Sequence, residues 1–151
     1  MNVALTRAKR GLIIIGNIET LNDIRPRYIF FPHWSWKVPK EIIDNYECVC
    51  FHMTDVPYGR GGSPLQNLIK RGHKNTKISA LRMVEELDAG PVYLKAPLSL
   101  EGRAQDIYAR ASKIVFEVIA EIVNSEPIAK DQDGEVTIFD RMQPFESELP
   151  K

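Results

Sequence analysis

Short apolar runs alternate with helical stretches along the first hundred residues, and this alternation constrains the fold more than any other feature. Runs of about four to eight residues rich in β-branched or aromatic side chains predict buried strands. The predicted strands are 12–15, 28–31, 47–51, 77–83 and 92–98. Pro39 and Ser63-Pro64 are typical of helix starts and predict helices over 40–43 and 64–71. The alternation is typical of an α/β domain with a largely parallel sheet.

The last predicted helix has the clearest amphipathic pattern. Apolar residues recur every three or four positions from Ile107 to Ile122, which places them on one face. Asp106 and Arg110, four residues apart, form an opposite-charge pair on the other side. We therefore expect this helix to pack on the sheet. The polar, proline-containing residues 126–151 are expected to form a tail over the surface.

Composition and charge narrow the class of protein. The chain has 151 residues, 44% hydrophobic and 26% charged, which is enough for one domain with a core. Twenty Lys and Arg balance 20 Asp and Glu, so no overall charge attracts nucleic acid or membranes. No apolar run approaches the ~20 residues that span a bilayer. With only Cys48 and Cys50 in one extended segment, we expect a reduced, cytoplasmic protein with no membrane partner.

Residues 47–62 combine reactive side chains with a glycine-rich loop. Cys48, Cys50 and His52 alternate along a predicted strand and so share one face. His52 stands at its carboxyl end, where open α/β sheets bind ligands, and Asp88 lies in a second turn. The residues alone leave open a catalytic pair, or a histidine at a strand end with an aspartate in an Asx-turn. A metal site at Cys48-x-Cys50-x-His52 is not expected, because alternate residues on a strand lie ~7 Å apart.

Two segments resemble the signature motifs of the formyltransferase fold family. Residues 52–61, His-Met-Thr-Asp-Val-Pro-Tyr-Gly-Arg-Gly, are similar to the family pattern His-x-Ser-x-x-Pro-x-x-Arg-Gly. Residues 86–92, Glu-Leu-Asp-Ala-Gly-Pro-Val, resemble the Leu-Asp-x-Gly segment that carries the family's catalytic aspartate. Val38-Pro39-Lys40 resembles the Leu-Pro-Lys before the histidine strand. The resemblance covers about residues 22–147 and implies a Rossmann-like three-layer fold with a shortened N-terminal half.

The resemblance implies an enzyme, an N-formyltransferase that moves a formyl group from 10-formyltetrahydrofolate to a primary amine. His52 would stabilise the oxyanion or relay a proton, and Asp88 would orient it and accept the proton of the amine. The co-substrate pocket would be lined by Ser35, Trp36, Val84, Glu85, Glu86 and Leu87, and the substrate loop would contain Thr54, Pro57, Arg60 and Gly61. No metal is implied. The alternative for Trp36 is a place in the core.

Cys50 departs from the family pattern, which has an asparagine two residues before the histidine. A thiol is a weak donor, and loss of one oxyanion donor typically lowers the rate by about 10²–10³-fold. The alternative function is therefore a catalytically impaired protein that keeps the fold and binds folate or a protein partner. A covalent role for Cys50 is a further alternative, although buried cysteines usually act as small apolar residues.

The acceptor is inferred from weaker features. A cluster of basic residues near the loop is suited to bind a phosphate or a nucleotide-sugar. The alternative is an ordinary solvated surface. The cluster comprises Arg60, Lys70, Arg71, His73, Lys74 and Lys77. Residues 139–147 resemble the Arg-x-x-Pro-x-x-Ser tail of sugar-modifying members. We expect a small-molecule amine, an amino-sugar on a nucleotide, rather than a nucleic acid. An incomplete sheet edge is compatible with a homodimer.

Residues 2–17 resemble a different family. They are similar to the last conserved motif of superfamily 1 helicases, whose first arginine contacts nucleotide phosphates. The sequence has no Gly-x-x-x-x-Gly-Lys-Ser/Thr loop, so we do not expect ATP hydrolysis. The expected organisation is a helicase-like segment 1–20 that supplies one strand, a formyltransferase core 21–125 and a tail 126–151.

Overall fold

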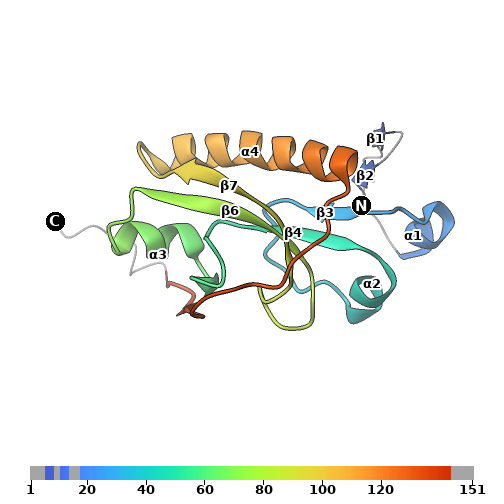
Figure 1. Ribbon diagram of the computed structural model, residues 1–151, viewed down its shortest axis with the longest axis horizontal. Coiled ribbons are helices and arrows are strands. Elements are labelled where there is room, and N and C mark those ends of the chain that lie inside the picture. The colour runs from blue at the N-terminus through green and yellow to red at the C-terminus, as the bar shows by residue number, and fades with distance from the viewer. Residues whose placement is uncertain (1–5, 9–10, 14–17, 144–151) are drawn as a thin grey trace.

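A mixed four-stranded sheet lies between helices in the computed structural model, which describes residues 6–8, 11–13 and 18–143 (Figure 1). The strand order is β3–β4–β6–β7, with bounds Ile29–Phe31, Cys48–His52, Asn75–Arg82 and Val92–Ser99. One face is covered by α4 (Ala104–Ser125). On the other lie α1 (Ile18–Ile24), α2 (Lys40–Asn45) and α3 (Pro64–Lys70). The three-layer α/β architecture expected from the resemblance is confirmed.

Strand directions differ from the expected largely parallel sheet. Within the four-stranded sheet only β3 and β4 run parallel, whereas β4–β6 and β6–β7 are antiparallel pairs. A parallel connection needs a crossover of about a dozen or more residues, usually a helix. No helix separates β6 from β7, because residues 83–91 form a loop, and β7 therefore returns antiparallel beside β6.

The amphipathic helix packs as its spacing predicts. α4 buries Ile107, Ala111, Val115, Val118 and Ile122, all on one face. Val118 and Ile122 join a core cluster that includes residues of β4, β6 and β7. Within the part of the chain that the structure describes, neither α4 nor any shorter helix combines the length and apolarity needed to cross a bilayer.

The described N-terminal residues 6–8 and 11–13 form a small sheet of their own instead of a strand of the central sheet. β1 (Thr6–Ala8) and β2 (Gly11–Ile13) pair antiparallel as a separate two-stranded sheet. Pairing between near neighbours closes a shorter loop than pairing with the central sheet, and so costs less chain entropy. Residues 14 and 15 of the expected strand, and most of the helicase-like stretch, lie outside the described residues.

The segment after α4 is more than the expected surface tail. In Figure 1 it crosses the sheet on the side opposite α4 and ends near α3. Val92 and Lys130 exchange two backbone hydrogen bonds, of 2.7 and 2.9 Å. Further on, β8 (Ile138–Phe139) pairs parallel with β5 (Arg60–Gly61), and the Phe139 side chain is buried in the core. Burial of this aromatic side chain anchors the end of the segment in the core.

Candidate active site

His52 ends β4 with its ring beside Asp88. His52 Nδ1 lies 3.5 Å from Asp88 Oδ2, and the two side chains are only 9% and 11% exposed. His52 Nε2 donates to the carbonyl oxygen of Gly59 at 2.7 Å. Asp88 Oδ2 also accepts from the backbone N–H of Gly61 at 3.0 Å. Both ring nitrogens thus face acceptors, and only the imidazolium form can donate to both.

The turn that carries Asp88 is tightly constrained. Asp88 has a φ of 54°, in the left-handed region that aspartate tolerates better than most residues. A side chain at Gly90 would place its Cβ only 1.8 Å from the carbonyl oxygen of Arg82. The turn therefore lies directly against the end of β6, which brings the Asp88 carboxylate to the neighbouring strand β4.

The loop after β4 orients the His52 ring. Thr54 is buried, and its hydroxyl donates to the Gly59 carbonyl at 3.1 Å, beside the His52 contact. Gly59 has a φ of 74°, and a Cβ there would lie 2.7 Å from the Phe139 ring. The Pro57 carbonyl accepts from the N–H of Thr137 at 3.1 Å. In this structure the expected substrate-loop residues Thr54 and Pro57 thus hold the loop together.

A cavity of about 210 Å³ adjoins Asp88, between α2 and the loop 83–91, and His52 lies behind Asp88 and is not among the lining residues. Its walls include Cys50 and Asp88. Of the six expected pocket residues, Trp36, Val84, Glu85, Glu86 and Leu87 line it. Ser35 is not among the lining residues. The alternative that placed Trp36 in the core is wrong, because the residue is 77% exposed and lines the cavity.

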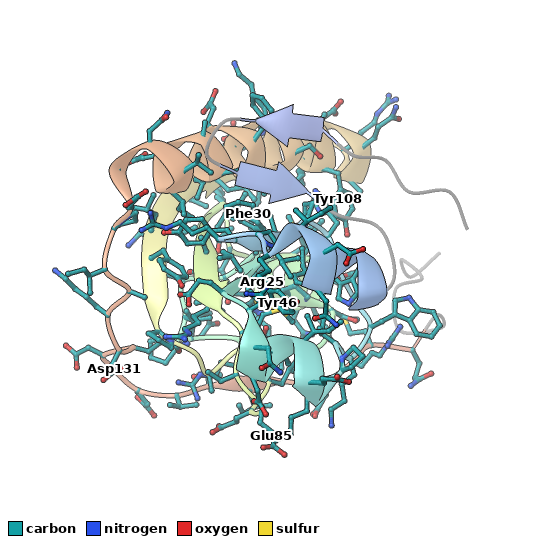
Figure 2. All side chains as sticks on the ribbon, turned by 90° about the vertical axis from the view of Figure 1, so that its right-hand side faces the viewer. Arg25, Phe30, Tyr46, Glu85, Tyr108 and Asp131 are labelled. Carbon is teal, nitrogen blue, oxygen red and sulfur yellow. The ribbon has the colours of Figure 1, made fainter. Side chains whose placement is uncertain are left out.

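The mouth of the cavity is crossed by an ion pair. Lys40 Nζ lies 3.2 Å from Glu85 Oε2, and both residues line the cavity. The hydrogen bond with Glu85, followed by the charge of Asp44, raises the pKa of Lys40 above its ordinary value. Figure 2 shows Glu85 extending outward beside α2. Because this pair is exposed, it opposes entry of a ligand only weakly.

The two cysteines are neutral thiols with different surroundings. Burial, followed by the charge of Asp88, raises the pKa of Cys50 to about 12, and burial and Glu47 raise that of Cys48 to about 12. A nucleophile needs the thiolate, so these values argue against covalent catalysis by Cys50 at neutral pH. Among the described residues, no three His, Cys, Asp or Glu side chains are grouped to hold a metal ion.

The expected basic cluster is dispersed among separate partners. Arg71 lies over the Phe139 ring, 4.6 Å from its centroid, and His73 Nε2 contacts the Tyr58 hydroxyl at 3.0 Å. Lys77 Nζ lies 2.9 Å from a carboxylate oxygen of Asp55. These contacts weaken the expectation of a single free cationic patch for a phosphate.

Arg60 and Gln132 form a contact that the sequence did not reveal. Arg60 Nε donates to Gln132 Oε1 at 3.0 Å, and an Arg60 terminal nitrogen lies 3.5 Å from Glu86. Arg60 belongs to the expected substrate loop. Gln132 stands alone between two aspartates in a polar segment, and no spacing or motif distinguished it from a loop residue.

Comparisons with known proteins identify the family. The methionyl-tRNA formyltransferase from Clostridium thermocellum has 51% sequence identity and a TM-score of 0.85, over 89% of this chain and 60% of that chain. The chain belongs to the formyltransferase-fold family. The methionyl-tRNA formyltransferase of Rickettsia prowazekii (strain Madrid E) is 30% identical over 131 residues, 80% of this chain and 43% of the relative.

More distant solved structures share the fold. HypX from Aquifex aeolicus, in complex with tetrahydrofolic acid, matches 83% of this chain and 23% of its own, with a TM-score of 0.65 at 21% identity. No family model matches the chain. The chain spans 41–43% of the length of the curated formyltransferases it matches.

Proposed function

We propose that this chain is the catalytic part of an N-formyltransferase that moves a formyl group from 10-formyltetrahydrofolate to a primary amine. The observation that carries the proposal is the nearly buried His52–Asp88 pair beside a cavity. The high identity to a methionyl-tRNA formyltransferase supports the same reaction class.

The cavity suits the flat ring of a folate. Val38, Ile43 and Met83 contribute apolar wall, and the backbone of loop residues 84–87, which also line the cavity, would bind the polar edge of the ring. Two proteins of this fold contain tetrahydrofolate in their structures, HypX from Aquifex aeolicus and PseJ from Anoxybacillus kamchatkensis. The bound co-substrate would supply the formyl carbon that the amine attacks.

The chain's own residues would handle the charge and the proton. The Nδ1–Oδ2 separation of 3.5 Å exceeds the usual hydrogen-bond length of about 2.7–3.2 Å. Because His52 Nε2 donates to the Gly59 carbonyl, Nδ1 carries a proton only in the imidazolium form, and in that form it would donate to an oxygen on which negative charge develops. The Asp88 carboxylate, at the cavity wall, would accept the proton that the attacking amine loses and return it to the tetrahydrofolate nitrogen as the bond from that nitrogen to the formyl carbon breaks. The Gly59 carbonyl keeps the imidazole in this orientation.

Two acceptors are proposed within this reaction class. The aminoacyl amine of methionyl-tRNA is favoured by 51% identity to the Clostridium thermocellum protein. An amino-sugar on a nucleotide is favoured by the pattern in residues 139–147. The sugar N-formyltransferases that match are 11–24% identical and support only the fold.

An assay with isotopically labelled 10-formyltetrahydrofolate tests the proposal. Purified chain would be mixed with methionyl-tRNA in one reaction and with a nucleotide-linked amino-sugar in another, with Asp88→Ala as the matched control. We expect labelled formamide on one acceptor and at least about a hundredfold less with Asp88→Ala. Absence of transfer with a folded chain that binds the co-substrate would favour the alternative, an impaired protein that binds folate or a protein partner.

A further inference from the structure

One side chain from the segment after α4 connects the two loops that form the candidate site. Gln132 Nε2 donates to the carbonyl oxygens of Asp88 and Gly90, at 2.8 Å each. Gln132 Oε1 accepts from Arg60 Nε at 3.0 Å. The amide thus makes three of the four hydrogen bonds open to it, all with residues of the loops 53–62 and 83–91.

These contacts close a ring around the Asp88 carboxylate. Gln132 holds the backbone of Asp88 from one side, and the N–H of Gly61 donates to the Asp88 carboxylate from the other. Gly61 follows Arg60, whose side chain contacts Gln132. Because Asp88 has a left-handed φ of 54°, contacts outside the turn are needed to keep its carboxylate in one place.

Other contacts already anchor the segment that carries Gln132. Lys130 pairs with Val92, the N–H of Thr137 donates to the Pro57 carbonyl, and Phe139 is buried. Loss of the Gln132 amide would therefore leave the segment in place, but the turn that carries Asp88 would lose two hydrogen bonds and become more mobile.

We infer that Gln132 is a positioning residue that holds the Asp88 carboxylate against His52. The inference rests on the proposed function for its catalytic consequence, but the placement of the carboxylate can be tested without it. Gln132→Leu keeps the approximate size of the side chain and removes all three hydrogen bonds. Gln132→Glu keeps an acceptor for Arg60 and removes both donations to the carbonyls.

The matched control is Asp131→Asn. Asp131 is exposed and, as Figure 2 shows, its side chain points away from the molecule. The substitution changes the neighbouring residue of the same segment and leaves the hydrogen bonds of Gln132 to Asp88, Gly90 and Arg60 in place.

Hydrogen exchange of the Gly61 amide, measured by NMR, reports the placement directly. We expect it to accelerate at least tenfold in Gln132→Leu and Gln132→Glu, whereas the amides of β6 keep their protection and Asp131→Asn matches the wild type. In the transfer assay, kcat should fall about 10–100-fold with KM for the co-substrate within about twofold. Unchanged Gly61 exchange in Gln132→Leu, or equal acceleration at Gly61 and in β6, overturns the inference. If the wild type transfers no formyl group, the proposed function fails, and the exchange result still decides the inference.

Discussion

The two faces of strand β4 have different tasks. Val49 lies in the apolar cluster beneath α4, together with Val118 and Ile122, and Phe51 packs against it. On the other side, the alternate residue Cys50 lines the cavity and His52 lies beside Asp88. Because side chains alternate along a strand, neighbouring residues of β4 point to opposite faces: one set stabilises the core, and the other belongs to the candidate site.

The difference between the faces is one of how the residues are held. The α4 face is held by apolar contacts, which do not depend strongly on direction. The site face is held by hydrogen bonds, such as those that His52 and Asp88 make with Gly59 and Gly61. It also depends on the turn 88–90, in which position 90 has room only for glycine. Substitutions on the two faces should therefore separate loss of stability from loss of activity.

His52→Ala should have the largest effect on the site face. We expect formyl transfer to fall about 10²–10⁴-fold, because the group that donates to the developing charge is gone. The Gly59 carbonyl still accepts from Thr54, so the loop should remain folded. Steady-state kinetics with a circular dichroism melt would check this, and a variant that keeps most of its activity would remove His52 from the site.

Ile122→Ala is the corresponding test of the α4 face. The side chain is fully buried, so we expect the free energy of unfolding to fall by about 2–5 kcal/mol. Denaturant unfolding measures this loss. Affinity for the co-substrate, measured where the variant is folded, should stay within about twofold of the wild type. A large loss of affinity would show that the two faces are not independent.

Cys50→Asn should sharpen the comparison by improving the site. The neutral thiol is a weak donor, and an amide at the cavity wall would be a better one. We expect the transfer rate to rise about tenfold or more, with Cys50→Ala as a control that gives no increase. Equal rates for Cys50→Asn and Cys50→Ala would mean that this position does not contact the developing charge.

Asp55→Asn should have the smallest effect and lies outside both faces. Burial raises the pKa of Asp55, but hydrogen bonds from Lys95 and Lys77 outweigh it and hold the pKa below its ordinary value of 3.8. The carboxylate therefore stabilises the fold above that value, and the contribution is lost as the pH falls through the lowered pKa. Thermal melts should show a small destabilisation of Asp55→Asn at pH 7, up to about 1 kcal/mol, that disappears in strong acid. A difference that persists in acid would contradict an ionic origin.

Much of the fold was predictable because local patterns determine it. The spacing of apolar residues from Ile107 to Ile122 reports the buried face of α4, and short apolar runs mark β3, β4, β6 and β7. The antiparallel course of β7 was not predictable in this way, since an apolar run has the same pattern in either direction. The direction of a strand depends on the connection before it. The alternation of strands and helices did not show that residues 83–91, between β6 and β7, form a loop without a helix.

The site was predictable where a motif carried it. His52 and Asp88 came from the resemblance, and the structure places them in proximity. Gln132 and Phe139 act through contacts distant in sequence; Gln132 stands between two aspartates, and Phe139 belongs to an apolar pair too short to predict a core contact. No local pattern distinguishes such residues, because only the tertiary structure brings their partners near.

Calorimetric titration with 5-formyltetrahydrofolate, a stable analogue of the co-substrate, tests most directly whether the cavity beside His52 and Asp88 is the folate site. We predict binding with Kd in the micromolar range, weakened in Asp88→Ala and unchanged in Asp131→Asn. A folded wild-type chain that binds no folate, or that binds equally well in Asp88→Ala, would contradict the assignment of the cavity.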